Sequence, residues 1–128
     1  MKYLFDTHTL IWYLNDYEKI PAEIQNIIHL DENEVYISIV SIWEIAIKFN
    51  INKLDLPYSI KEIIAILKAK HFKILSIRIK YLILYRNLSL IHRDPFDRLI
   101  VSTAISDDLI LLTSDSENQL YPVNWIWN

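Results

Sequence analysis

Short apolar runs alternate along the chain with segments in which apolar residues recur every three or four positions. Runs of this kind, flanked by polar residues, are typical of buried strands. The clearest run covers residues 109–113. We predict five strands, at residues 3–5, 35–39, 74–77, 109–113 and 125–127.

The intervening segments have the apolar spacing of helices. Leu10, Ile11 and Leu14, for example, share one helical face. Capping residues and prolines indicate where the helices begin. We expect six helices, which start after Asp6, at Pro21, at Ser41, at Ser59 (with Glu62 three residues later), at Ile79 and at Asp94 before Pro95. Strands that alternate with helices are typical of an α/β fold with a parallel sheet, and without repeats or linkers we expect one domain over residues 1–128.

Composition excludes several classes of protein. The 128 residues are enough for one domain and too few for two. With 52% hydrophobic residues and no charge-free apolar run of about 18 residues, the chain matches neither a disordered nor a membrane-spanning protein. Asp6 precedes any possible signal-peptide region, and there is no cysteine, so we expect a cytoplasmic protein without disulfides or thiolate metal sites.

Glycine is also absent, which excludes glycine-rich phosphate loops. Turn positions with left-handed backbone must then be occupied by asparagine or aspartate, at some steric cost. The candidates are Asn15, Asp16, Asn33, Asn50, Asn52, Asp107 and Asp108.

Charge is distributed unevenly, although the net charge is only −3. Residues 1–44 carry two basic and eight acidic groups, residues 45–93 carry ten and two, and residues 94–128 carry one and six. A negative net charge argues against a nucleic-acid partner, because lysine and arginine neutralise phosphates. The basic middle segment leaves two interpretations open, a track for a polyanion beside an acidic pocket or ordinary solvated helix faces.

Two carboxylates follow predicted strands, Asp6 after the first and Asp115 after the run at 109–113. Open parallel sheets bind ligands at the carboxyl ends of their strands. Both side chains are therefore expected at one edge of the sheet, provided that the two strands are neighbours. Two helices that begin near this edge contribute Glu44 and Asp97, whereas Asp94 is expected to be an N-cap.

Four carboxylates in one place predict a divalent cation, because without one they would raise one another's pKa. Mg²⁺ or Mn²⁺ prefers such ligands and supports phosphodiester hydrolysis. We therefore predict that Asp6, Glu44, Asp97 and Asp115 are catalytic and metal-binding. Each also has a structural interpretation: a capping box of Glu44 with Ser41, a favourable helix-dipole charge at Asp97, and turn or loop acids at Asp115 and Asp6.

Four separated blocks resemble, in order and spacing, the motifs of PIN-domain ribonucleases. They are residues 5–12 (FDTHTLIW), 38–48 (SIVSIWEIAIK), 92–100 (HRDPFDRLI) and 111–115 (LLTSD). More narrowly, they resemble VapC toxins of bacterial toxin–antitoxin pairs, over nearly the whole chain. The resemblance implies a PIN domain over residues 1–128, with a five-stranded parallel sheet flanked by helices. It places the family's acidic residues on Asp6, Glu44, Asp97 and Asp115.

The resemblance also implies an activity and partners. These are Mg²⁺-dependent endoribonuclease cleavage of structured RNA such as tRNA or ribosomal RNA, with Mn²⁺ as a possible substitute, a small VapB-like antitoxin, and a homodimer. Two other functions stay open: a catalytically silent RNA-binding or scaffold domain, and a phosphohydrolase that uses Asp6 as nucleophile. Such phosphatases normally have a second acid two residues on, where this chain has His8.

Several polar residues near the acids have two possible roles. His8 and His92 could contact metal or phosphate, although a hydrogen-bonded structural role is favoured. Lys48 could pair with the glutamate four residues before it or contact RNA. Arg93 and Arg98 could contact phosphate or balance local charge. Four tryptophans are interpreted as core or subunit-interface residues, namely Trp12, Trp43, Trp125 and Trp127.

Overall fold

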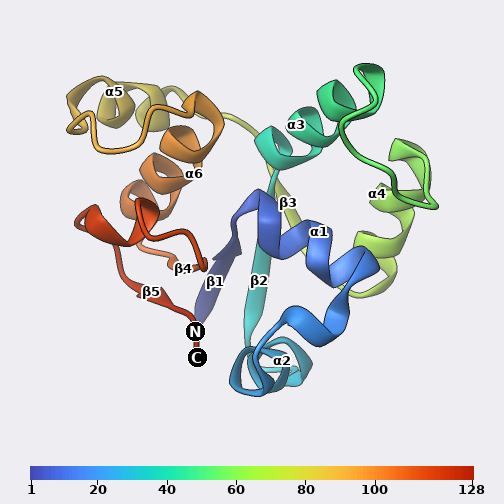
Figure 1. Cartoon of the computed structure of the whole chain (residues 1–128). Coiled ribbons are helices and arrows are strands. Elements are labelled where there is room, and N and C mark those ends of the chain that lie inside the picture. Colours follow the sequence, from blue (N-terminus) through green and yellow to red (C-terminus); the bar gives the residue numbers. More distant parts are fainter.

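A five-stranded sheet runs through the centre of the computed structural model, which describes residues 1–128 (Figure 1). In spatial order its strands are β3 (Lys73–Leu75), β2 (Glu34–Ser38), β1 (Lys2–Phe5), β4 (Ile110–Leu112) and β5 (Trp125–Ile126). All four neighbouring pairs are parallel, which confirms the predicted sheet. The chain passes from β1 outward to β3 and then returns to the other side of β1, so the strand order reverses between β1 and β4.

Six α-helices and two short 3-10 helices surround the sheet. They are α1 (Thr7–Asn15), α2 (Ala22–His29), α3 (Ile39–Asn50), α4 (Ile60–Ala69), α5 (Ile79–Asn87), α6 (Pro95–Ser106), η1 (Tyr17–Lys19) and η2 (Asn118–Leu120). In Figure 1, α1, α2 and α4 lie on one side of the sheet, and α5 and α6 lie on the other. None of these helices has the length and apolar character that a membrane crossing requires.

Alternate residues of β1 belong to two different cores. Tyr3 and Phe5 pack into a cluster with residues of α1, α2, α3 and α4, and Leu4 packs into a second cluster with residues of α5 and α6. Successive side chains of a strand point to opposite faces, so a strand that is buried on both faces must be apolar throughout. The short, continuous apolar run at residues 3–5 is explained by this double burial.

The register of the parallel strands aligns the carboxyl ends of β1, β4 and β5 along one edge of the sheet. Phe5 pairs with Leu112, and Leu112 pairs with Ile126 on the next strand. The residues that follow, Asp6 and Thr113, therefore leave the sheet at the same edge and beside the strand-order reversal. In open parallel sheets this is where ligands bind.

The predicted N-cap of the third helix, Ser41, was wrong by three residues. Helix α3 begins at Ile39, and its N-cap is Ser38, whose hydroxyl accepts the N–H of Val40 at 3.0 Å. Ser41 instead lies inside the helix, fully buried, and accepts a hydrogen bond from the Thr7 hydroxyl at 3.0 Å. A capping box of Ser41 with Glu44 is therefore excluded. The error arises because β2 ends earlier than predicted, at Ser38.

Three residues have a positive φ, at the ends of helices α3, α4 and α6. They are Asn52 (φ 55°), His71 (φ 64°) and Asp108 (φ 54°). Asn52 and Asp108 were among the predicted candidates, whereas His71 was not, and the other candidates have ordinary backbone. The third strand was also predicted slightly too late, at 74–77, because it ends at Leu75 where the chain turns toward α5.

Candidate active site

Asp6 lies at the end of β1, where it is also the N-cap of α1. One carboxylate oxygen accepts the N–H of Thr9 at 2.8 Å and its hydroxyl at 2.7 Å, and the other accepts the Thr113 hydroxyl. The side chain is 1% exposed. Burial raises the pKa of Asp6 above its ordinary value, although the hydrogen bonds from Thr113 and Thr9 oppose the rise.

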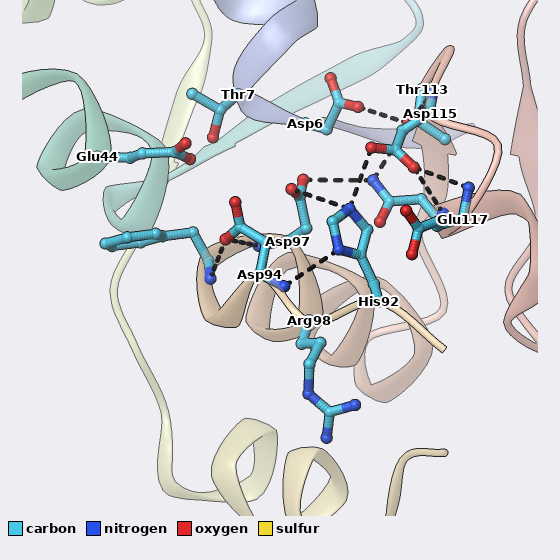
Figure 2. Close-up of polar contacts among 12 residues, drawn as sticks. Asp6, Thr7, Glu44, His92, Asp94, Asp97, Arg98, Thr113, Asp115 and Glu117 are labelled. Carbon is cyan, nitrogen blue, oxygen red and sulfur yellow. Dashed lines mark hydrogen bonds and ion pairs between the residues drawn. The ribbon is translucent and has the colours of Figure 1, made fainter. Parts of the chain in front are cut away.

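Asp94 and Asp97 have different roles at the start of α6. Asp94 is the N-cap, as predicted, and one of its oxygens accepts the N–H groups of Phe96 at 2.8 Å and Asp97 at 3.3 Å. Asp97, on the first helical turn, points toward Asp6 and Asp115 (Figure 2). Burial, followed by repulsion from Asp94 and Asp6, raises the pKa of Asp97 to about 7.

Asp115 is held by the loop that follows β4. One of its oxygens accepts the N–H groups of Glu117 at 2.8 Å and Asn118 at 3.0 Å. Burial alone would raise the pKa of Asp115, but the hydrogen bonds from Asn118 and His92 outweigh it and lower the pKa. The turn interpretation of Asp115 is therefore correct for one oxygen, while the second oxygen faces the other acids.

His92 lies between Asp97 and Asp115 (Figure 2). Its Nε2 is 3.1 Å from Oδ2 of Asp115 and 3.3 Å from Oδ2 of Asp97, while its Nδ1 accepts the N–H of Asp94 at 3.1 Å. Because Nδ1 is an acceptor, the proton of the neutral ring is on Nε2, which donates to the carboxylates. The hydrogen-bonded role expected for His92 is therefore what the structure shows. Its position between two acids had no signal in the sequence.

Glu44 comes from α3 and faces the other acids across the site (Figure 2). It is 7% exposed, and its Oε2 lies 3.1 Å from Nζ of Lys48, one helical turn later. This confirms the pairing that the spacing of the two residues allows. The second oxygen, Oε1, is buried without any hydrogen-bond partner. A buried carboxylate oxygen without a donor is costly, and a cation would satisfy it.

The structure thus brings the four predicted acids to one edge of the sheet, but not equally close together. Ligand atoms of His92, Asp97 and Asp115 all lie within 4.8 Å of one another. Asp6 is connected to this set through Thr113, and Glu44 lies on the opposite side of the space. The carboxylate oxygens of the four acids are the ligands that Mg²⁺ and Mn²⁺ prefer.

Arg98 does not point into the site (Figure 2). Its buried guanidinium donates to the backbone carbonyls of Ser89 at 2.8 Å and Tyr85 at 3.2 Å, and it lies over the Tyr85 ring. It connects α6 to the end of α5, a role that neither of its two predicted interpretations included. Arg93 is exposed beside the site.

The tryptophans divide into two groups. Trp12 packs against Trp127 with ring centroids 5.5 Å apart, and both are partly buried against the core. Trp43 and Trp125 are 54% and 40% exposed, so a core role is excluded for them. His8 is also exposed, and its ring packs on Trp12 rather than on an acid.

Comparison with known proteins identifies the fold family. Residues 3–122 match the family model of the PIN domain. The chain belongs to the PIN-domain family. No curated protein was found with a similar sequence. The predicted PIN fold is confirmed.

Several solved structures share this fold. A chain in VapBC2 from Rickettsia felis, bound to a DNA fragment from their promoter, matches this PIN domain with a TM-score of 0.75 and 20% identity over 100% of both chains. VapBC-1 from nontypeable Haemophilus influenzae matches with a TM-score of 0.71 and 19% identity, over 98% of this chain and 97% of that chain. FitAcB from Neisseria gonorrhoeae matches with a TM-score of 0.61 and 19% identity, over 100% and 97%.

Sequence reasoning missed the residues that hold the acids in place. Thr9, Thr113 and Asn118 donate to the carboxylates of this PIN domain, as described above. All three lie within three residues of a predicted acid, so short spacing was an available signal for these contacts. The sequence does not indicate the additional contact of Asn118 with Asp97, which comes from another part of the chain.

Proposed function

We propose that this PIN domain is a metal-dependent endoribonuclease and the toxin of a VapBC-type toxin–antitoxin pair. The observation that carries the nuclease proposal is the set of buried and half-buried acids at the carboxyl edge of the sheet, with Oε1 of Glu44 lacking any partner. The toxin assignment is supported by the VapBC complexes among the structures of the same fold. The family's substrates make RNA, such as tRNA or ribosomal RNA, the expected target.

The donor set fits Mg²⁺ or Mn²⁺. Asp6, Glu44, Asp97 and Asp115 would hold the ion, and all four are carboxylates that lie at this edge of the sheet (Figure 2). When bound, such an ion orients a phosphodiester, lowers the pKa of an attacking water and stabilises charge on the leaving oxygen. The His92 ring, with Nε2 directed at Asp97 and Asp115, orients these two carboxylates.

Lys48 is the cation nearest to Glu44, and its ammonium group is partly exposed beside the site. It neutralises one glutamate oxygen and leaves the other free. A partly exposed lysine at this position can also bind a phosphate of the substrate.

One rival enzyme function is opposed by the environment of Asp6. An aspartyl nucleophile must approach the phosphorus of a large substrate, but the Asp6 side chain is almost completely buried. Metal binding needs less access, because Oδ2 of Asp6 accepts one hydrogen bond and keeps a second lone pair. The second rival, a silent RNA-binding or scaffold domain, predicts binding without cleavage.

The deciding experiment is cleavage of structured RNA by purified protein, with Mg²⁺ and with excess EDTA. We expect cleavage only with the metal and a loss of at least about 100-fold in Asp97→Asn. Asp108→Asn is the matched control, because it removes the same charge from an exposed position at the other end of α6. Undiminished cleavage in EDTA, or by Asp97→Asn, would contradict the proposal.

A further inference from the structure

Asn118 contacts the acidic site although it is not one of the predicted residues. It is the first residue of η2 and is 0% exposed. Its side-chain Nδ2 lies 3.4 Å from Oδ1 of Asp97 and 3.3 Å from Oγ1 of Thr113. Its backbone N–H donates to Oδ1 of Asp115 at 3.0 Å. One residue thus contacts two of the acids and the threonine between them.

Thr113 extends this contact to Asp6. A hydroxyl has one proton, and Thr113 donates it to Oδ2 of Asp6. The lone pairs of the same hydroxyl accept the N–H of Asp115 at 3.1 Å and the Nδ2 of Asn118. With both donors in place, the Thr113 proton is directed at Asp6. Asn118 is therefore connected to three carboxylates that come from three different parts of the chain.

Packing alone does not explain an asparagine at this position. Its Oδ1 is buried and accepts no hydrogen bond, and an unpaired buried amide oxygen destabilises a fold. An apolar residue would avoid this penalty. What the asparagine supplies is an N–H₂ group directed at Asp97 and Thr113 without adding a positive charge. A lysine or arginine would bring a charge that competes with a metal ion for the same carboxylates.

We propose that Asn118 is a positioning residue, which holds Asp97 and Asp115, and through Thr113 also Asp6, in the orientation that binds a divalent cation. This inference rests on the metal-dependent function proposed above. Asn118 has no contact with substrate in this role and acts only through the carboxylates.

The test is direct binding of Mn²⁺ to the intact protein, measured by electron paramagnetic resonance of the free ion. We expect Asn118→Ala to weaken Mn²⁺ binding by about 10- to 100-fold, as the loss of a residue that orients metal ligands typically does. Gln119→Ala is the matched control. Gln119 is the next residue of η2, and its Nε2 donates to the backbone carbonyl of Thr113 at 3.0 Å without touching an acid. Its loss should leave Mn²⁺ affinity unchanged.

The melting temperature without metal shows how much each substitution on η2 destabilises the protein. Asn118→Ala with wild-type Mn²⁺ affinity would overturn the inference, and so would an equal loss of affinity in Gln119→Ala. If Asn118→Ala gives no cooperative melt, Asn118→Ser, which lacks the amide but keeps a polar side chain, replaces it in the same comparison.

RNA cleavage by the wild-type protein is assayed in parallel to separate the two proposals. A wild-type protein that binds Mn²⁺ but cuts no RNA contradicts the nuclease, while Asn118 is still judged by Mn²⁺ affinity. RNA cleavage together with unchanged Mn²⁺ affinity in Asn118→Ala contradicts only the positioning role. A wild-type protein that binds no Mn²⁺ overturns the positioning role.

Discussion

Asp94 and Asp97, three residues apart on α6, show how local geometry gives two identical side chains different roles. The Asp94 carboxylate is directed at the backbone N–H groups of its own helix, which otherwise lack partners. Asp97 points away from the helix axis toward Asp6 and His92. A capping role is expected to appear in stability, and a metal-binding role in activity.

We predict that Asp94→Ala lowers the free energy of unfolding by about 1 kcal/mol, as the loss of an N-cap typically does. Cleavage at low temperature should largely survive. Asp97→Asn should abolish cleavage without a loss of metal-free stability, because it removes a carboxylate that is buried beside Asp6 and Asp94. Chemical denaturation and cleavage assays of both variants provide the measurement. If Asp94→Ala kept its stability but no longer bound Mn²⁺, Asp94 would be the metal ligand and Asp97 the capping residue.

The acids themselves could be predicted from the sequence, because strand ends and helix starts determine where they lie. Their partners could not. The contact of His92 with Asp115 joins residues 23 positions apart, and that of Asn118 with Asp97 joins residues 21 apart. Such contacts depend on how the loop before α6 meets the loop after β4, which apolar spacing does not encode. The unpartnered oxygen of Glu44 is likewise visible only once its surroundings are known.

At the scale of elements, three helices end in the same way without glycine. In α3, α4 and α6 the residue after the C-cap has a positive φ, and the following N–H bonds to the carbonyl five residues back. In α4 the N–H of Phe72 donates to the carbonyl of Leu67 at 2.9 Å, and His71 is the residue with the positive φ. This is the Schellman motif, which normally contains glycine. The sequence indicated asparagine and aspartate here, and it gave no reason to expect histidine.

We predict that His71→Gly stabilises the protein by about 0.5 to 1 kcal/mol. Relief of left-handed strain, about 1–2 kcal/mol, exceeds the extra entropy that glycine gives the unfolded chain. The control is Lys70→Gly, at the exposed preceding position with a φ of −91°, which should destabilise. Urea unfolding of both variants measures the difference. Stabilisation by both substitutions, or by neither, would show that the His71 backbone is not strained.

A second feature of the elements is the contact between α5 and the end of α6. The hydroxyl of Tyr81 donates to Asp107, and Lys80 pairs with the same carboxylate. Burial, the hydrogen bond to Asp107 and its charge raise the pKa of Tyr81 to about 12. The folded protein therefore holds this proton more tightly than the unfolded chain, whose tyrosines have a pKa of about 10.

The stability that the Tyr81 proton contributes should be fully present below pH 10 and lost as the pH rises through about 12. We predict that Tyr81→Phe costs about 2 kcal/mol near neutral pH, because it removes a hydrogen bond to a charged group. Its deficit relative to wild type should shrink between pH 10 and 12. Tyr58→Phe, at a tyrosine that packs against the core cluster on the other side of the sheet, should show neither effect. A constant deficit across this pH range would refute the assignment.

For the whole molecule, the charge of the basic segment at residues 45–93, one interpretation of which was a track for a polyanion, is partly neutralised by the fold. Of its ten basic groups, Lys48, Lys73 and Lys80 pair with Glu44, Glu34 and Asp107. The basic residues also lie at different edges of the sheet. Lys73 begins β3, at the edge away from the acids, whereas Arg93 is exposed in the loop that carries His92. Sequence counts alone could not separate the two.

Ten phosphate contacts would give a slope of log K against log salt of about −9 at the value known for B-form DNA. We therefore predict that RNA affinity falls with salt less steeply than this. Asp97→Asn serves as the cleavage-deficient parent, and titrations at several salt concentrations give the slope. In this parent, Arg93→Ala should reduce the slope by about 1, because an exposed arginine beside the acids releases a counterion on binding. Lys73→Ala should leave the slope unchanged, because Lys73 is already paired with Glu34 at the opposite edge. Equal effects of the two substitutions would mean that RNA does not approach at the acidic edge, and an effect of Lys73→Ala alone would place its path on the opposite side of the sheet.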